Sequence, residues 1–86
     1  MYEVILGRRA QKDLDKLEDA LCQRVLKALS TLADNPRPAD SIKLKRGEGG
    51  YRVRVGDYRV IYDIDDMSCT VVVLTVRHRS EVYKRL

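Results

Sequence analysis

The chain contains no tryptophan and no phenylalanine, so its five tyrosines supply all of the aromatic surface. Its only cysteines, Cys22 and Cys69, lack the spacing of a metal site, a redox motif or a disulfide framework, so we expect reduced thiols and no cofactor. No apolar run approaches the roughly 20 residues that span a bilayer. The N-terminus also lacks the basic leader of a signal peptide. These absences predict a cytoplasmic protein with no membrane segment.

Two sequence features that could suggest ligand sites carry little signal. The glycines of 47–50 have neither the lysine spacing of a P-loop nor a GxGxxG pattern, which excludes a nucleotide site of those types. The acidic residues of 63–66 are clustered where a turn is expected, and turn chemistry explains them without a metal. We therefore predict no metal site.

The positive charge is concentrated in two segments. The chain has 86 residues and a net charge of +4, of which residues 1–41 contribute nothing. Residues 42–62 hold six basic and two acidic residues, and residues 77–86 hold four basic residues and one acidic residue. If these segments meet in space, they form one basic patch of the kind that nucleic-acid-binding proteins present.

Hydrophobic periodicity predicts a strand followed by two helices. Residues 2–6 are rich in β-formers, and apolar residues then recur at helical spacing over 8–17 and again over 21–32. Asp19 is the predicted N-cap of the second helix. The prolines of 35–38 end that helix. The two helices form a hairpin whose apolar face must be buried.

The sequence of the second half of the chain predicts β-strands. Residues 42–45 predict a short edge segment, 51–62 a hairpin, Asp65-Asp66 a turn, and 69–76 a buried or central strand. We therefore predict a single α+β domain over 1–86 with the order β-α-α-β-β-β. In it the helical hairpin packs on one face of a mostly antiparallel sheet, and a short C-terminal helix follows.

The segment 51–62 is organised around Gly56-Asp57, a two-residue turn signal. Such a turn places Arg54 opposite Arg59, and alternation brings Arg52 onto the same face, while the tyrosines and valines face the core. Like charges directly opposite one another are destabilising, so this face is best tolerated where it binds an anion. Arginine suits phosphate because its planar fork binds two oxygens and keeps its charge. A solvated polar face is the alternative interpretation.

The C-terminal segment Val76-Arg77-His78-Arg79-Ser80-Glu81-Val82-Tyr83 follows the buried strand. Together with residues 43–45 and 51–62, it resembles the RelE family of bacterial and archaeal toxins, within the RelE/ParE superfamily. The resemblance covers almost the whole chain. Residues 56–62 and 76–83 are its most specific parts.

The resemblance implies a role for each matching residue. Arg59 matches the arginine that holds the scissile phosphate, and Arg77 matches the general acid toward the leaving 5′-oxygen. Tyr83 matches the tyrosine that stacks on the nucleotide, and Arg54 completes the expected catalytic set. Arg52 and Arg79 are expected to contact RNA. For Lys43, Lys45 and Arg46 two interpretations stay open, contacts with ribosomal RNA or the substrate backbone, or a solvated surface.

The chain departs from the family at two positions. Arg52 and Arg54 stand where well-studied members carry lysines, the second of which is their proposed general base. Lysine can lose its proton among like charges, but arginine effectively cannot, which leaves the base open. His78 is a candidate acid/base because histidine titrates near neutrality. Alternation sends it away from Arg77, which favours a structural histidine.

Family members with this pattern are ribosome-dependent endoribonucleases that cut mRNA in the A site and are neutralised by an antitoxin. The resemblance implies metal-independent attack by the 2′-hydroxyl, which gives 2′,3′-cyclic phosphate and 5′-hydroxyl ends. The expected partners are the ribosome, mRNA and a cognate antitoxin that carries the DNA-binding function of the complex.

Two alternatives accompany this hypothesis. ParE-type relatives share the fold but inhibit DNA gyrase, and they typically lack the full set of basic and tyrosine site residues. The presence of Arg54, Arg59, Arg77 and Tyr83 argues against that activity. A nucleic-acid-binding or antitoxin-binding module with weakened catalysis is the third interpretation, and the arginines at the lysine positions keep it open.

Overall fold

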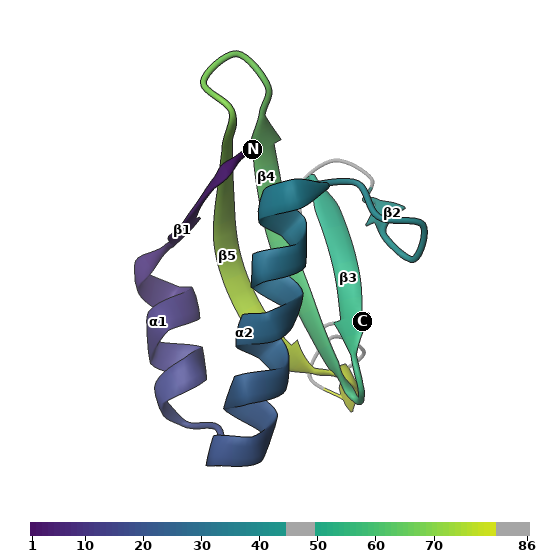
Figure 1. Cartoon of the computed structure of the whole chain (residues 1–86). Coiled ribbons are helices and arrows are strands. Elements are labelled where there is room, and N and C mark those ends of the chain that lie inside the picture. Colours follow the sequence, from purple (N-terminus) through teal and green to yellow (C-terminus); the bar gives the residue numbers. More distant parts are fainter. Residues whose placement is uncertain (45–49, 81–86) are drawn as a thin grey trace.

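The computed structural model describes residues 1–44 and 50–80. The elements are β1 (Glu3–Leu6), α1 (Arg8–Asp15), α2 (Asp19–Asp34), β2 (Ile42–Lys43), β3 (Tyr51–Val55), β4 (Tyr58–Asp65) and β5 (Thr70–His78). The strands form one sheet of order β1-β5-β4-β3-β2, and both helices lie on the same side of it (Figure 1). The predicted α+β architecture is therefore confirmed. The expected C-terminal helix falls largely on 81–86, outside the described residues.

The helices bury the apolar stripes that the sequence shows. Ala10 and Leu14 of α1 are buried, as are Val25, Leu29 and Leu32 of α2. The predicted cap of α2 is wrong by one residue. Glu18 has the extended N-cap conformation and Asp19 is the first residue of the helix. There the negative charge of Asp19 interacts favourably with the positive end of the helix dipole. In the described ranges no helix is long and apolar enough to cross a membrane.

The sheet is antiparallel except at one edge. β1 pairs in parallel with β5, and the other three neighbouring pairs are antiparallel. β5 is an internal strand between β1 and β4, which accounts for its nearly continuous apolar sequence. The strand begins at Thr70 rather than at the predicted Cys69, because Cys69 has a φ of 52° and belongs to the β4–β5 turn.

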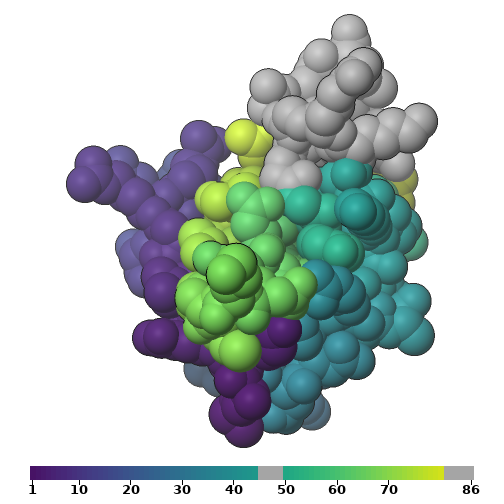
Figure 2. All heavy atoms as spheres, turned by 90° about the horizontal axis from the view of Figure 1, so that it is seen from above, coloured from purple at the N-terminus to yellow at the C-terminus, as the bar shows by residue number. Residues whose placement is uncertain are grey.

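A polar network joins three segments at the β4–β5 turn. The predicted turn role of Asp65 is confirmed, because its Oδ1 accepts the backbone N–H groups of residues 67 and 68. Asp66 does more, since it accepts two hydrogen bonds from Arg37 and one from the Tyr2 hydroxyl, at 2.6 Å. These bonds lower the pKa of the Asp66 carboxyl, with the Arg37 contact as the main cause. Figure 2 shows this turn between the N-terminal residues and the connector after α2.

The β3–β4 hairpin has the predicted register, with Val55 opposite Tyr58 and Arg54 opposite Arg59. Gly56 has a φ of 60°, and Cys69 is the only other described residue with positive φ, so Asp57 has a negative value. Glycine at the first central position with positive φ is the pattern of a type II′ turn. That turn matches the twist of the strands and fixes which side chains share a face.

We expect Gly56→Ala to destabilise the protein by about 1–2 kcal/mol, because an L-residue is strained at this φ. A Cβ at this position would also lie 3.3 Å from the Arg24 guanidinium. Asp57→Ala, in the same turn at negative φ, should change the free energy of unfolding by less than about 0.5 kcal/mol. Urea unfolding of both variants measures this difference. Equal effects would show that the backbone conformation of Gly56 does not matter.

Candidate active site

Three arginines lie side by side across three neighbouring strands. Arg54 of β3 is opposite Arg59 of β4, and Arg59 is in turn opposite Arg77 of β5. Residues paired in this way have Cβ atoms about 4.5–5.5 Å apart. We call these three residues the arginine row. The valines that alternate with them in β3 and β4 are buried under the helices, so the row lies on the face of the sheet opposite to the helices.

Arg77 reaches the face opposite to the helices because β5 contains a bulge. The residues of β4 pair with Val73 and next with Thr75, so Leu74 has no opposite residue. Val73 and Val76 are both buried against the helices, although strict alternation would place residues three apart on opposite faces. A bulge inserts one residue and re-aims the side chains that follow it. Here it turns Arg77 onto the face of the arginine row.

The row concentrates positive charge. Arg59, at its centre, has a relative exposure of only 8%, while Arg54 is exposed and Arg77 is half-buried. Within the described ranges the two ion pairs are Arg9–Asp13 and Arg37–Asp66, and neither involves Arg54 or Arg77. Like charges directly opposite one another on neighbouring strands are unfavourable, and an anion bound there would offset their repulsion. A phosphate group, with oxygens for several guanidinium forks, has the matching chemistry.

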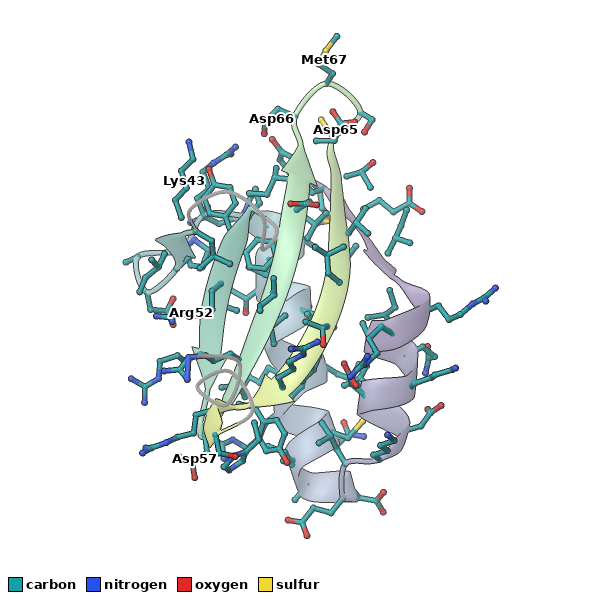
Figure 3. The ribbon with its side chains drawn as sticks, turned by 180° about the vertical axis from the view of Figure 1, so that it is seen from behind. Lys43, Arg52, Asp57, Asp65, Asp66 and Met67 are labelled. Atoms are coloured by element: carbon teal, nitrogen blue, oxygen red, sulfur yellow. The ribbon has the colours of Figure 1, made fainter. Side chains whose placement is uncertain are left out.

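The half-buried Arg52 lies one step along the sheet from the row, in register with Ile61. Its Nε atom is buried and has no hydrogen-bond partner among the described residues. Lys43 is not brought to this face, because its register partner is Tyr51, which faces the helices. Figure 3 shows Lys43 and Asp57 toward opposite ends of β3, with Arg52 between them. Two further predicted contacts, Lys45 and Arg46, lie outside the described residues, as does Tyr83.

The end of β5 is fixed to the β3–β4 turn. The backbone N–H of Arg79 donates to the Asp57 carbonyl at 2.8 Å, while the Arg79 side chain is exposed. This bond carries the pairing of the two segments one residue beyond the β5 strand. The predicted contact of Arg79 with RNA stays a prediction.

His78 lies on the face opposite to the arginine row, as alternation predicts. It is paired with Tyr58, and the two rings meet edge to face with centroids 5.2 Å apart. Its Nδ1 accepts the Ser80 backbone N–H at 3.2 Å and lies 2.9 Å from the Ser80 hydroxyl. These contacts favour a packing role, and the acid/base role of His78 stays a prediction.

Two polar residues that carry almost no signal in the sequence lie beside Arg77. Arg77 Nε donates to Thr75 Oγ1 at 3.3 Å, and the Thr75 hydroxyl donates to Asp13 Oδ2 of α1 at 2.7 Å. The same carboxylate oxygen accepts the Val76 backbone N–H at 3.0 Å. Thr75 is the single hydroxyl residue between Val71 and Arg77, which is a weak sequence signal. Asp13 gives none, because it belongs to the polar side of an amphipathic helix.

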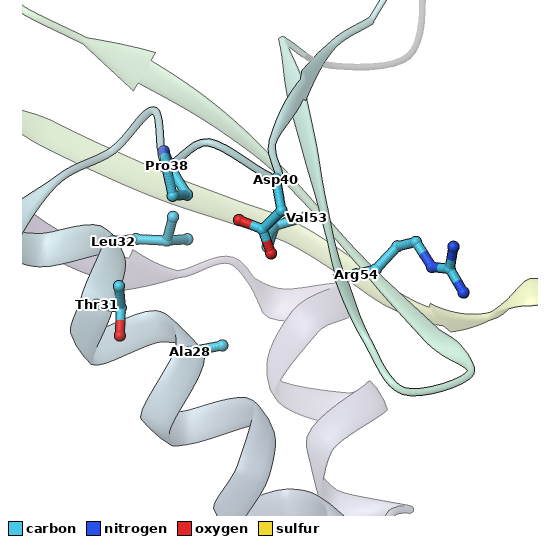
Figure 4. Close-up of a pocket in the computed structure, with 7 residues that line it drawn as sticks. All are labelled: Ala28, Thr31, Leu32, Pro38, Asp40, Val53 and Arg54. Atoms are coloured by element: carbon cyan, nitrogen blue, oxygen red, sulfur yellow. The ribbon is translucent and has the colours of Figure 1, made fainter.

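A small pocket lies on the other side of β3. It has a volume of about 150 Å³ and lies between α2, the connector at 38–40 and β3. Arg54 borders it, but the guanidinium of Arg54 points away from the other lining residues (Figure 4). The pocket therefore lies beside the Arg54 end of the arginine row, and the Arg54 guanidinium does not point into it.

The contacts of Asp13 predict an acid-dependent loss of stability. Burial raises the pKa of its carboxyl, but the hydrogen bonds from Thr75, Val76 and Arg9 outweigh burial and lower it overall. A lowered pKa in the folded state stabilises the protein above the unfolded value of about 3.9, and this contribution is lost as the pH falls further. Urea unfolding between about pH 6 and pH 3 should therefore show a larger loss for the wild type than for Asp13→Asn. Parallel pH profiles would contradict this assignment.

The comparisons with known proteins agree on the family. A family model described as the ParE toxin of the type II toxin–antitoxin system parDE matches residues 4–83. The chain belongs to the RelE/ParE superfamily of type II toxins. Within it, the toxin is 34% identical to the toxin RelG of Mycobacterium tuberculosis, over 98% of both chains. Relatives at this similarity carry RelE-type names, so the ParE alternative is not favoured.

Solved structures show the same fold. The toxin superposes with a TM-score of 0.80 and 35% identity on a chain of the RelBE2 toxin–antitoxin complex of Mycobacterium tuberculosis, covering 91% of this chain and 98% of that one. An archaeal RelE–RelB complex from Pyrococcus horikoshii gives 0.80 at 32% identity, with coverages of 91% and 94%. The isolated RelE toxin of Escherichia coli gives 0.78 at 26% identity, with coverages of 99% and 98%. The predicted RelE resemblance is confirmed.

Proposed function

We propose that this toxin is a ribosome-dependent endoribonuclease that cleaves mRNA in the A site and thereby inhibits translation. The observation that carries the proposal is the arginine row, which places three cations in register on the face of the sheet opposite to the helices. A toxin that acted only by binding another protein would not need such a convergent phosphate site. The RelE-type names of its relatives support the same activity.

The proposed reaction is an in-line displacement at phosphorus. The 2′-oxygen of the ribose attacks the adjacent phosphate, a P–O2′ bond forms, and the P–O5′ bond breaks. The 2′-hydroxyl proton leaves to a base, and the departing 5′-oxygen receives a proton from an acid. The products are a 2′,3′-cyclic phosphate and a 5′-hydroxyl. DNA lacks the nucleophile, which restricts this reaction to RNA.

Each arginine of the row would have a catalytic role that follows from its position. Arg59, at the centre, would hold the non-bridging oxygens of the phosphate as negative charge grows on them. Arg77, on the β5 side, would donate toward the leaving 5′-oxygen. Preorganised cations of this kind stabilise the transition state more than the ground state. Arg54, on the β3 side, would stabilise the 2′-oxygen as it loses its proton, rather than remove that proton itself.

We further propose that a cognate antitoxin neutralises the toxin and supplies the DNA-binding function of the complex. The solved relatives from Mycobacterium tuberculosis and Pyrococcus horikoshii are complexes of this composition, toxin with antitoxin. Tyr83, from the sequence resemblance, and Lys45 and Arg46, as basic residues of the sequence, complete the proposed RNA site. The expected compartment is the cytoplasm, where mRNA is translated.

A purified translation system tests the activity directly. Primer extension on mRNA should show discrete stops at A-site codons when wild-type toxin is present, and none without ribosomes. A DNA gyrase supercoiling assay with the same preparation provides the comparison. Undisturbed translation together with inhibited supercoiling would overturn the nuclease and establish the ParE-type activity.

A further inference from the structure

We propose that Asp13 and Thr75 are positioning residues that fix the direction of the Arg77 guanidinium. Helix α1 would thereby take part in building a site that otherwise lies on the sheet. The effect on cleavage rests on the proposed nuclease function. The contacts that carry the inference are Arg77 Nε to Thr75 Oγ1 at 3.3 Å and Thr75 Oγ1 to Asp13 Oδ2 at 2.7 Å.

The hydrogen-bond directions leave one consistent arrangement. An ionised carboxylate only accepts, and a threonine hydroxyl donates one hydrogen and accepts through its lone pairs. Thr75 therefore gives its hydrogen to Asp13, and its oxygen lone pairs remain to accept Arg77 Nε–H. Donation to a charged acceptor polarises the hydroxyl, which strengthens its acceptance from Arg77. Because Nε holds the side chain in place, the two terminal nitrogens of Arg77 can face the phosphate.

Asp13 reaches β5 because the neighbouring strand stops short. β1 pairs with β5 only as far as Val73, and the last backbone bond there runs from the Gly7 N–H to the Val73 carbonyl at 2.8 Å. A Cβ at Gly7 would lie 3.0 Å from that carbonyl, so glycine permits this approach. The chain then turns into α1, which runs beside β5 (Figure 1). Beyond the end of β1, Asp13 Oδ2 accepts the backbone N–H of Val76 in β5.

The hydrogen-bonded chain from Arg77 through Thr75 to Asp13 is largely shielded from water. Thr75 has a relative exposure of 9%, and the Asp13 side chain one of 11%. Electrostatic interactions are stronger away from water, so the Asp13 charge offsets part of the repulsion that Arg77 feels from the arginine row. Arg9 Nε forms an ion pair with the other oxygen of this carboxylate, Asp13 Oδ1, at 3.2 Å. Arg77 is thus held through its Nε atom on the side of α1.

Thr75→Val and Thr75→Ser form a matched pair, because valine keeps the shape and removes the hydroxyl, whereas serine keeps the hydroxyl. Single-turnover cleavage on programmed ribosomes should fall about 10-fold or more in Thr75→Val, mostly in the rate at saturation, since a misplaced group costs rate steeply. Thr75→Ser should stay near the wild-type rate. In an Arg77→Ala background, Thr75→Val should cause no further loss. A further loss of the same size would overturn the proposal.

A second measurement is independent of cleavage. The Arg77 Nε–H should give a resolved, slowly exchanging ¹⁵N–¹H NMR signal in the wild type and in Thr75→Ser, and a fast-exchanging one in Thr75→Val. If the wild-type toxin cuts no RNA but this pattern holds, the positioning stands and the nuclease proposal falls. Unchanged Arg77 exchange in Thr75→Val, or released Arg77 with an unchanged cleavage rate, would overturn the inference.

Discussion

Replacing Arg77 by alanine is expected to slow mRNA cleavage by about 10²–10³-fold, the usual effect of removing one preorganised transition-state donor. Arg77 stands at the β5 end of the arginine row, where it would donate toward the leaving 5′-oxygen. Neither Arg59 nor Arg54 can take over, because their strands place them at the centre and the far end of the row. Ribosome affinity should change far less, since Arg77 is one of many positive charges on the chain.

Single-turnover cleavage on programmed ribosomes measures this loss. Arg8→Ala is the matched control, because it removes one exposed arginine at the start of α1 and lowers the net charge equally. Arg77→Lys keeps the charge but loses the fork and should recover only part of the rate. Equal losses in Arg77→Ala and Arg8→Ala would mean that charge alone matters and that the row is not a local site.

Tyr62→Ala is expected to destabilise the fold by about 3–5 kcal/mol, the range for replacing large aromatic core residues with alanine. Tyr62 is the largest fully buried side chain among the described residues, with 0% exposure, and its ring stacks on Tyr51 with centroids 5.9 Å apart. Its hydroxyl donates to the Pro36 carbonyl at 2.8 Å, which ties the connector after α2 to the centre of the sheet. Small domains have only about 5–15 kcal/mol of total stability, so this loss is severe.

Tyr62→Phe separates the two contributions. It keeps the ring and leaves the buried Pro36 carbonyl without its donor, which should cost about 1–3 kcal/mol. Urea unfolding of the phenylalanine variant gives a clear answer even if Tyr62→Ala does not fold. A phenylalanine variant as stable as the wild type would show that the hydroxyl contributes nothing to the connection.

The hairpin was predictable from its sequence because turn chemistry and alternation act locally. Gly56-Asp57 fixes a two-residue turn, and that alone places Arg54 opposite Arg59. The helix pair was predictable for the same reason, since its periodicity and the prolines of 35–38 depend on neighbouring residues. The cap was misplaced by one residue because Glu18 and Asp19 are adjacent acidic residues, and only the backbone conformation shows that Glu18 precedes the helix.

The third member of the row could not be placed in this way. Alternation along β5 changes at Leu74, and nothing in a continuous apolar run marks which residue is the extra one. The contact from Asp13 to β5 and that from Asp66 to Arg37 are also hidden, because they join residues far apart in the chain. Such contacts can be inferred only when the order of the strands in the sheet is known. The position of Arg77 in the row is therefore a finding of the structure.

A ribosome-bound mRNA with a single 2′-deoxynucleotide on the 5′ side of the scissile phosphate tests the central claim most directly. The wild-type toxin should cut the all-ribose mRNA and leave a 2′,3′-cyclic phosphate and a 5′-hydroxyl. It should leave the matched deoxy-substituted mRNA intact, because that substrate lacks the nucleophile. Equal cutting of both mRNAs would contradict 2′-hydroxyl attack, and no cutting of either would contradict the arginine row as a nuclease site.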